Sequence, residues 1–540
     1  TAFAAGAEKP LDGKTVILHS NDVHGAIDLY AAMAALKADY EAQGAEVILA
    51  DAGDYSQGTV YVSVNKGADA VTMMNATGYD VVTLGNHEFD YGYAQLVENM
   101  KAAKFQVLCA DVLGADGKTI FDANTIIEKG GVKIGFFGLE TPEAQTKANP
   151  ALIKGLKFDT DLKAVAEKQL EALKDDDVVI ALSHLGVDDS SKPYTSYDLY
   201  NAAKGIDFII DGHSHTVMAN KQVTDASGKA VTLTQTGSYF KNIGKMTVGA
   251  DGTITTELID TYEGLDATVA ATASNWISAV DDMLGEEIAV GDTKFYINDP
   301  ATGKRRIRSG ETNLGDFVAD GIYTYFNEVE QLHCDIAIMN GGGIRSDEDA
   351  GYWTFKTCKQ VSPFGNVACL MSVTGKQIQD ALEFAARFAG AEGKENGGFL
   401  QVAGATYEIH TDIPNTVQTD DKNVWIGSAT GTPRVQNVKI YDRANGTYVP
   451  LDENKTYALA GMNYTLRNLG DGFAMFDGAE LIKDYVSEDY LVMSTYAMTF
   501  GGVDAEGLPH LSSANSVLAE YPGYLLDYEN PYGAGRISIL

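Results

Sequence analysis

The segment YDVVTLGNHEFD, residues 79–90, passes from a short apolar run directly into a cluster of polar side chains. Its β-branched run is typical of a buried strand. Gly85 then permits a tight turn that carries the polar residues after it inward. The segment therefore predicts a strand that ends at a chemically active loop.

Six other segments repeat this pattern of a buried strand followed by polar residues. They are KTVILHS (14–20), EVILADAGD (46–54), KFQVLCAD (104–111), VKIGFFGLE (132–140), DDVVIALSHLG (176–186) and IDFIIDGHSH (206–215). Helical stretches lie between them at 29–42, 93–103 and 162–173. This alternation is typical of βαβ units, so we expect a layered α/β domain that antiparallel strands near 231–260 would close.

Nearly every one of these strands ends in a residue type that binds metal ions. The candidates are Asp22, His24, Asp54, Asn86, His184, His213 and His215. Strand ends of open α/β sheets converge on one crevice. Seven nitrogen and oxygen ligands from five loops suffice for two divalent ions that share one carboxylate.

The local spacing supports this interpretation. Asp22 with His24, and His213 with His215, are two residues apart, and in extended backbone such residues point to the same side. A single histidine at a strand end is more often a hydrogen-bonded structural residue. Five ligand-bearing motifs on separate strands, however, would rarely arise from packing alone.

The order of these motifs, D-x-H, G-D, G-N-H-E, H and G-H-x-H, resembles the calcineurin-like metallophosphoesterase superfamily. GNHEFD and motifs in the second half look like the bacterial UDP-sugar hydrolase/5′-nucleotidase family, which is related to animal ecto-5′-nucleotidase. The resemblance runs from about residue 14 to 471 and beyond. It implies a four-layer α/β sandwich with a dimetal site at 12–262, a helical linker or hinge at 263–300, and a separate C-terminal α/β substrate-binding domain at 301–540.

The resemblance also implies a ligand set for each ion. Asp22, His24, Asp54 and His215 would hold one ion, and Asp54, Asn86, His184 and His213 would hold the other, so that Asp54 bridges them. The ions would be of the zinc, manganese or cobalt type. The counterpart of His215 is often an amide residue in the nucleotidase family. This departure leaves a competent ligand and bears on metal preference.

His87 and Asp90 follow the predicted ligand Asn86 and need another role. The family pattern makes them a catalytic dyad, in which the carboxylate orients an imidazolium that stabilises charge on the phosphate or leaving group. An alternative interpretation is that Asp90 only caps a helix that begins near Tyr91.

Three motifs in the second half resemble the family's substrate pocket. RRIRSGETNLGD contains Arg308, NGGGIR contains Asn340 and Arg345, and SPFGN contains Phe364 and Asn366. In MNYTLRNLGDGF, Tyr464 would be a second base-stacking ring and Asp471 would bind the ribose hydroxyls. The alternatives are that Phe364 is a core residue and NGGGIR a plain turn. Stacking tolerates different bases, so broad base specificity is expected.

The composition of the 540 residues limits the possible partners. The chain is 45% hydrophobic and 21% charged, which is typical of globular domains, and its length favours two or more of them. A formal charge of −35 disfavours a nucleic-acid polymer, so the ligand should be a small nucleotide. No apolar run is long enough to cross a bilayer. Nothing in the sequence indicates an oligomeric state.

Two shorter features complete the predictions. The start, TAFAAGAEKP, reads like the remnant of a removed leader, so we expect a secreted, periplasmic or cell-surface protein. The four cysteines form no CxxC pair and look like packing residues, although Cys358 and Cys369 could form a disulfide.

The function expected from all of this is hydrolysis of nucleoside 5′-monophosphates by a water that two metal ions activate, with di- and triphosphates and UDP-sugars as further substrates. A 2′,3′-cyclic phosphodiesterase/3′-nucleotidase is the nearest alternative, because it would share the metal site. A non-catalytic nucleotide-binding surface protein is the second.

Overall fold

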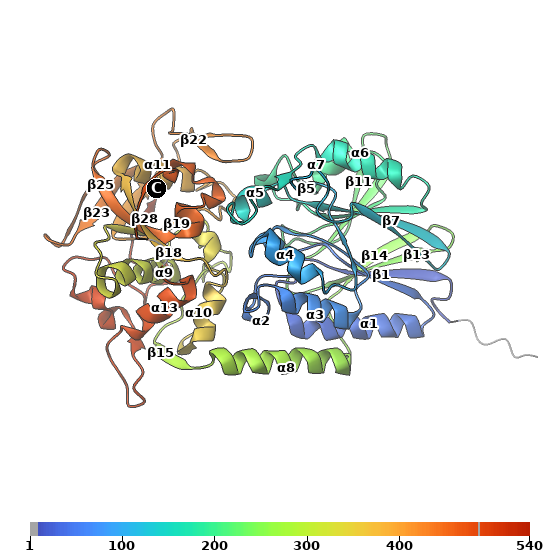
Figure 1. Cartoon of the computed structure of the whole chain (residues 1–540), viewed down its shortest axis with the longest axis horizontal. Helices are drawn as coiled ribbons and strands as arrows, with labels where there is room; N and C mark the ends of the chain where they lie inside the picture. Colours follow the sequence, from blue (N-terminus) through green and yellow to red (C-terminus); the bar gives the residue numbers. More distant parts are fainter. Residues whose placement is uncertain (1–8, 484–485) are drawn as a thin grey trace, which may run out of the picture. The chain divides into compact units, whose positions relative to one another are not determined.

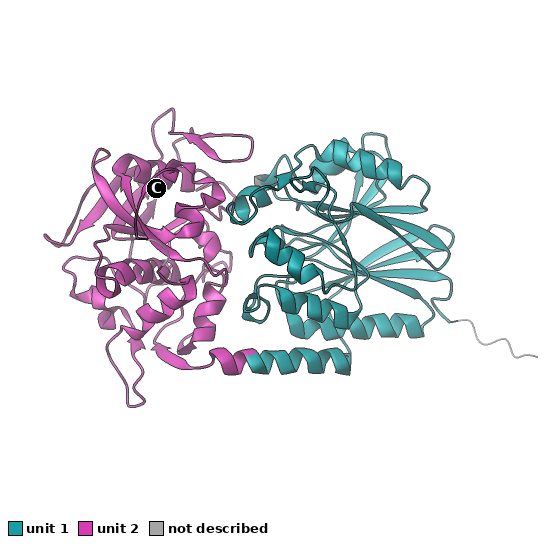
Figure 2. Cartoon of the chain, viewed as in Figure 1, with its two compact units in different colours: residues 1–279 teal, residues 280–540 magenta. Residues whose placement is uncertain are grey.

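The computed structural model describes residues 9–483 and 486–540. The whole chain is drawn in Figure 1, and its two compact units, one up to Ala279 and the other from Val280 to Leu540, are coloured separately in Figure 2. The boundary falls inside helix α8 (Ala267–Leu284), which lies within the helical linker expected at 263–300. The linker limits at 263 and 300, and the role of the linker as a hinge, stay predictions.

The N-terminal unit contains two six-stranded sheets. The first has the strand order β14 (Ile254–Ile259), β13 (Ile243–Gly249), β1 (Lys14–Ser20), β2 (Glu46–Asp51), β3 (Val81–Thr83), β4 (Gln106–Leu108). The second has the order β11 (Val217–Thr224), β12 (Ala230–Thr236), β10 (Phe208–Ile210), β9 (Val178–His184), β7 (Val132–Glu140), β6 (Asn124–Lys129). The inner strands are parallel, and antiparallel pairs β13–β14 and β11–β12 close one edge of each sheet.

Apolar side chains from both sheets pack against each other in the middle of this unit. Ile17 and Ile48 come from the first sheet, and Phe136 and Ile180 from the second. Helices cover the two outer faces, with α1 (Tyr30–Ala42), α3 (Ala68–Thr77) and α4 (Tyr93–Met100) on the first sheet and α6 (Leu162–Ala172) and α7 (Ser196–Ala202) on the second (Figure 1). The four-layer α/β sandwich is therefore confirmed.

Helix α8 begins as part of the N-terminal unit. Val269 and Ala273 are buried in the core under the first sheet's helices. The indole of Trp276 donates a hydrogen bond of 2.7 Å to the Tyr61 carbonyl. An apolar face and one directional bond thus fix the first turns of α8.

The C-terminal unit is built around a five-stranded mixed sheet. Its order is β19 (Leu400–Ala403), β16 (Ile336–Asn340), β25 (Thr456–Met462), β18 (Ala368–Thr374), β26 (Glu480–Lys483). A four-stranded sheet has the order β24 (Thr447–Pro450), β23 (Val435–Asp442), β20 (Ala405–Ile409), β28 (Ile537–Ile539). A three-stranded sheet has the order β17 (Gly351–Thr354), β15 (Glu287–Gly291), β27 (His510–Leu511). A two-stranded sheet pairs β21 (Gln418–Thr419) with β22 (Trp425–Gly427).

Both faces of the five-stranded sheet are buried. On β16, Ala337 and Met339 enter one apolar core and Ile336 and Ile338 the other, as the two-residue period of a strand requires. Helices α9 (Asn313–Thr324), α10 (Phe355–Val361) and α13 (Asp489–Met498) contribute to the first core. Helix α11 (Gly375–Ala385) contributes to the second.

A buried ion pair ties the last strand to α9. The guanidinium Nη2 of Arg536 lies 2.8 Å from Asp320 Oδ2, and both side chains are fully buried. Tyr528 and Tyr524 donate hydrogen bonds to the same carboxylate. Because a buried charge is costly without partners, this network fixes the end of the chain onto the core.

The cysteines are buried thiols, as their sparse spacing suggested. Cys358 lies on α10 in one core, and Cys369 lies on β18 in the other. The disulfide considered between them is therefore wrong, because the five-stranded sheet directs the two side chains to different cores. Among residues 9–483 and 486–540, no helix has the length and apolar character to cross a membrane.

Candidate metal centre

The predicted ligands gather where parallel strands of both sheets end. One group consists of Asp22, His24 and His215, and the other of Asp54, His184 and His213. Within each group, one ligand atom from every residue lies within 4.8 Å of the others. Six side chains that are up to 193 positions apart in the sequence thus form two compact sets of donors.

The two groups are immediate neighbours. His24 Nε2 lies 3.8 Å from Asp22 Oδ1 and 3.8 Å from Asp54 Oδ2. His184 Nε2 lies 3.0 Å from Asp54 Oδ2 and 3.9 Å from Asp22 Oδ1. Carboxylates of both groups therefore face histidines of both groups, which is the arrangement that a shared carboxylate between two ions needs.

Asn86, the seventh predicted ligand, follows a glycine that touches Asp54. A Cβ atom on Gly85 would lie 2.2 Å from Asp54 Oδ1, so only glycine fits there. The Asn86 Oδ1 atom is buried and has no hydrogen-bond partner among the described residues. An orphaned buried acceptor is costly, and a metal ion would satisfy it. The donor set present therefore fits two divalent ions.

The backbone at these ligands adopts an uncommon conformation. Asp22, His24, Asp54, His213 and His215 have φ values of +49°, +47°, +64°, +75° and +52°. Non-glycine residues rarely adopt this left-handed region, and each instance costs about 1–3 kcal/mol. Five such residues in one cluster show that tertiary contacts hold the loops in shape. Clusters of this kind are typical of functional sites.

Glu88 is one of those contacts, and the sequence reasoning missed it. Its carboxylate accepts hydrogen bonds from the backbone N–H groups of Gly85 (2.6 Å), Asp54 (2.8 Å), Tyr55 (2.9 Å) and Ser56 (2.9 Å). Burial and the nearby Asp54 carboxylate raise the pKa of Glu88 to about 7, whereas the N–H donors favour its ionised form. The E of the GNHE motif was the available signal.

Hydrogen bonds fix which ring nitrogen each histidine presents. His24 Nδ1 donates to the Gln57 carbonyl at 2.8 Å, and His184 Nδ1 donates to the Ala52 carbonyl at 2.6 Å. A carbonyl can only accept, so Nδ1 carries the proton when each ring is neutral, and Nε2 is the atom that a metal would bind. His213 is held differently, because its Nε2 lies 2.9 Å from Glu143 Oε2. Glu143 was also missed, although it lies three residues after β7.

Ionisation in the cluster follows from burial and pairing. Burial lowers the pKa of His24 to about 3, so this ring is neutral and can act as a ligand. Burial would raise the pKa of Asp54, but His184 and His87 hold it well below its usual value. For His184, burial opposes protonation, yet Asp54 and Asp22 raise its pKa well above the usual value. The carboxylates thus supply negative charge that attracts a cation.

His87 and Asp90 form a hydrogen-bonded pair beside the ligands. His87 Nδ1 lies 2.5 Å from Asp90 Oδ2, and the His87 ring centroid is 5.4 Å from that of His24. The alternative role for Asp90 as a helix cap is wrong, because α4 (Tyr93–Met100) has Gly92 as its N-cap. The carboxylate instead orients the imidazole, whose role in the reaction stays a prediction.

Predicted substrate-binding residues of the C-terminal unit also come together. The Asn340 amide donates to Asp471 Oδ2 at 3.4 Å, and the Arg345 guanidinium lies 5.7 Å from the centre of the Phe364 ring. Burial, and then the charges of Arg305 and Arg345, lower the pKa of Arg308 well below its usual value. Burial and the neighbouring arginines thus disfavour the positive charge of Arg308, and an anionic ligand would offset that cost.

The glycine loop NGGGIR is constrained by close approach, which a plain turn would not require. A Cβ on Gly341 would lie 2.3 Å from the Ile307 carbonyl, next to Arg308. Asn366 is held by its backbone, whose N–H donates to Asp489 at 3.2 Å. Tyr464 is 8% exposed, and its ring lies 2.3 Å from where a Cβ on Gly470 would be. Its role as a stacking ring stays a prediction.

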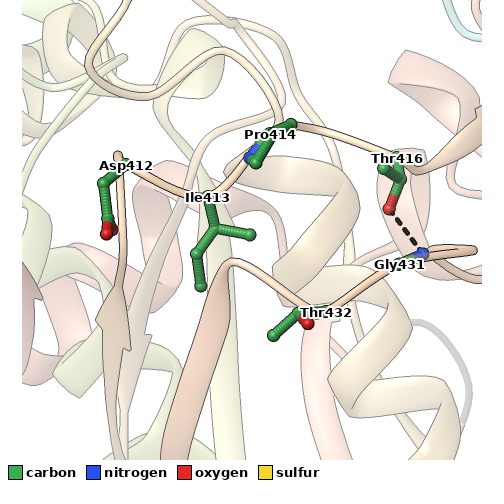
Figure 3. A pocket seen from close by; sticks show the side chains of 6 residues that line it. All are labelled: Asp412, Ile413, Pro414, Thr416, Gly431 and Thr432. Atoms are coloured by element: carbon green, nitrogen blue, oxygen red, sulfur yellow. Dashed lines mark hydrogen bonds between the residues drawn. The ribbon is translucent and has the colours of Figure 1, made fainter.

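A surface pocket of about 350 Å³ lies elsewhere in the C-terminal unit (Figure 3). Its lining residues are Asp412, Ile413, Pro414, Thr416, Gly431 and Thr432. The Gly431 N–H donates to Thr416 Oγ1 at 3.0 Å, which joins the two lining loops. None of the predicted binding residues lines this pocket.

Comparison with known proteins places both units. A family model described as 5′-nucleotidase, C-terminal domain, matches residues 289–478, and one described as bacterial capsule synthesis protein PGA_cap matches residues 21–229. The chain is 28% identical to the trifunctional nucleotide phosphoesterase protein YfkN of Bacillus subtilis over 92% of the chain, but it spans only 34% of YfkN.

Two further matches cover whole proteins. Mouse 5′-nucleotidase is 28% identical, with 95% of this chain and 93% of that protein covered. The fold matches the crystal structure of a 5′-nucleotidase precursor from Thermus thermophilus with a TM-score of 0.77 at 24% identity, covering 98% and 99% of the two chains. Fold, donor set and matches together define a metal-dependent phosphoester hydrolase. Within that class, residues 289–478 match the 5′-nucleotidase C-terminal domain, and the chain is similar over most of its length to animal 5′-nucleotidases.

Proposed function

We propose that this protein hydrolyses nucleoside 5′-monophosphates to nucleoside and phosphate, and that it also accepts nucleoside di- and triphosphates and UDP-sugars. The observation that carries the proposal is the pair of adjacent ligand groups, Asp22–His24–His215 and Asp54–His184–His213. The match of residues 289–478 to the 5′-nucleotidase C-terminal domain supports a nucleotide as the substrate.

We assign the ions as the resemblance implies, with Asp54 shared and Asn86 completing the second group. Two divalent ions of the zinc, manganese or cobalt type would lower the pKa of a bound water and offset charge on the phosphoryl oxygens. The chain's part is to hold the donors in a fixed geometry. The backbone hydrogen bonds from Asp22 N–H to the Gly53 carbonyl (2.9 Å) and from His24 N–H to the Asp54 carbonyl (3.0 Å) serve this purpose.

His87 is proposed to donate a hydrogen bond to a phosphoryl oxygen or to the leaving oxygen. Asp90 accepts from Nδ1 and so fixes the orientation of the imidazole ring. The side chain of His87 is 16% exposed, and its ring centroid lies 5.4 Å from that of the predicted ligand His24. A hydrogen bond that strengthens as charge develops lowers the barrier of the reaction.

Residues of the C-terminal unit are proposed to bind the nucleoside. Arg308 and Arg345 would contact anionic or polar groups of the substrate. Asp471 and Asn340 would bind the ribose hydroxyls, and Phe364 would stack on the base. Asn366 and Tyr464 complete the predicted set. The contact between Asn340 and Asp471 supports the assignment, because a shared hydroxyl could bridge two polar groups 3.4 Å apart.

A second candidate is a wider phosphoesterase activity that includes 2′,3′-cyclic nucleotides and 3′-nucleotides. The observation that favours it is the likeness to YfkN, which is named a trifunctional nucleotide phosphoesterase. Both candidates use the same metal centre, and they differ in which ester bond is presented to it.

A substrate panel with phosphate release as the readout tests both candidates. 5′-AMP, 3′-AMP, 2′,3′-cyclic AMP, ADP, ATP and UDP-glucose would be compared with zinc, manganese or cobalt added singly to stripped protein. The proposal expects 5′-AMP to be turned over most rapidly. Turnover of 2′,3′-cyclic AMP or 3′-AMP above that of 5′-AMP would favour the second candidate.

Removal of the metal separates an enzyme from a non-catalytic binding protein. A strong chelator should abolish phosphate release, and added metal should restore it. If the protein binds nucleotide but turns none over with any of the added metals, the result would instead support a non-catalytic binding protein. We also propose that the protein is exported from the cytoplasm, and fractionation of the producing cells tests this.

A further inference from the structure

Glu143 differs from the groups that accept from the rings of His24 and His184, because it is a side chain and not a backbone carbonyl. The rings of His24 and His184 use the backbone carbonyls of Gln57 and Ala52. The positions of those two carbonyl oxygens are set by the backbone of their loops. The position of the His213 ring, in contrast, depends on the Glu143 carboxylate.

The orientation of His213 is also the reverse of the other two. His24 and His184 donate through Nδ1, whereas His213 donates through Nε2 to Glu143 Oε2 at 2.9 Å. A neutral imidazole has one N–H and one lone pair, so this bond leaves the lone pair on Nδ1. Loss of the acceptor would free the ring to adopt the other tautomer or to rotate.

Local structure explains why Glu143 can hold the ring. The residue follows β7 and precedes the short helix α5 (Ala144–Lys147), and its backbone N–H donates to Thr141 Oγ1 at 3.3 Å. Its side chain is 12% exposed and that of His213 is 16% exposed, so water competes weakly for the bond. The His213 backbone is fixed separately, because its N–H donates to Asp22 at 3.1 Å.

We propose that Glu143 is a positioning residue for His213, whose Nε2–H it accepts so that Nδ1 is presented to the ion of the Asp54 group. The inference rests on the proposed function in one respect, the assignment of His213 as a metal ligand. Carboxylate partners of metal-bound histidines fix the tautomer and raise the basicity of the donor. Their loss typically weakens metal binding by about 10- to 100-fold.

The test compares Glu143→Ala and Glu143→Gln with a matched control and a reference. The control is Gln145→Ala, on the same short helix, and the reference is His213→Ala, which removes the ligand itself. Zinc or manganese affinity of stripped protein is measured by competition with a chelator of known affinity. Glu143→Ala should weaken one of two ions by about 10- to 100-fold and leave the other unchanged. Glu143→Gln, which keeps an acceptor oxygen, should lie between it and the wild type.

A second readout does not depend on metal or activity. Nitrogen-15 spectra of histidine-labelled, metal-free protein report the tautomer of each ring, and the His213→Ala spectrum assigns the His213 signals. The wild type and Gln145→Ala should show an Nε2–H form for His213, and Glu143→Ala should lose it. An unchanged His213 tautomer in Glu143→Ala would overturn the proposal, as would wild-type affinity for both ions.

The two readouts separate this inference from the proposed function. If the wild type binds no pair of ions, the proposed function fails, while the tautomer of His213 still tests whether Glu143 positions the ring. If Glu143→Ala weakens both ions equally and also lowers the thermal midpoint of the metal-free protein, Glu143 has a general structural role. That result would refute positioning.

Discussion

Glu88→Gln should weaken metal binding although Glu88 is not a predicted ligand. Both carboxylate oxygens of Glu88 are used, Oε2 by the N–H groups of Gly85 and Asp54, and Oε1 by those of Tyr55 and Ser56. Glutamine has one acceptor oxygen and places an NH2 group where the other oxygen was. Two buried N–H donors would then face another donor.

The size of the effect follows from this count. A buried donor that loses its partner costs about 1–3 kcal/mol, so two cost about 2–6 kcal/mol in total. The loop can avoid that cost by opening, and it carries Asp54 and the glycine before Asn86. Even the lower value corresponds to about 30-fold weaker metal binding, since every 1.4 kcal/mol is a factor of ten.

The assay is chelator competition with zinc or manganese on stripped protein at pH 8, together with thermal unfolding of the metal-free form. Glu98→Gln is the matched control, because Glu98 lies on the nearby helix α4 with its side chain 65% exposed. The control should behave as wild type in both measurements. Wild-type metal affinity and an unchanged midpoint in Glu88→Gln would refute the argument that this carboxylate holds the ligand loops.

Three other predictions follow from single side chains. His87→Ala should lower kcat for 5′-AMP by about 100- to 1000-fold with unchanged metal content, and normal turnover would remove His87 from the mechanism. Burial lowers the pKa of His19 to about 3, so only the unfolded chain binds this proton as the pH falls below about 6.5. The wild type should therefore lose about 1.4 kcal/mol of unfolding free energy at pH 5.5, measured by denaturant unfolding of the metal-free protein. His19→Leu should abolish this loss, whereas the control His333→Gln, at an exposed histidine, should retain it. Arg308→Ala should raise KM for 5′-AMP by about 10- to 100-fold without loss of bound metal; a change confined to kcat would contradict a binding role.

Several elements could be predicted because their signals are local. Apolar runs of strand length marked β1, β2, β7 and β9, and helix α8 lies inside the helical linker expected at 263–300. The candidate metal ligands could be named because each stands at the end of such a strand. Parallel strands end at the same side of a sheet, so their convergence needed no knowledge of distant contacts.

The partners of those ligands were not predictable in the same way. Glu88 and Glu143 act on groups brought near by the fold, and a glutamate in a sequence carries no mark of the N–H group or ring that it will meet. The same limit applies to Tyr464, whose ring packs against Gly470 and is nearly buried. Local spacing alone could not show that.

The sequence by itself determined the kinds of donor, their order along the chain and the layered α/β class, because periodicity and residue chemistry are properties of short segments. Only the tertiary structure decided which carboxylates face which histidines and which ring nitrogen each histidine presents. It also decided that Cys358 and Cys369 lie in different cores. Those choices depend on distances between segments that lie up to 193 residues apart, and such distances arise from packing of the whole unit.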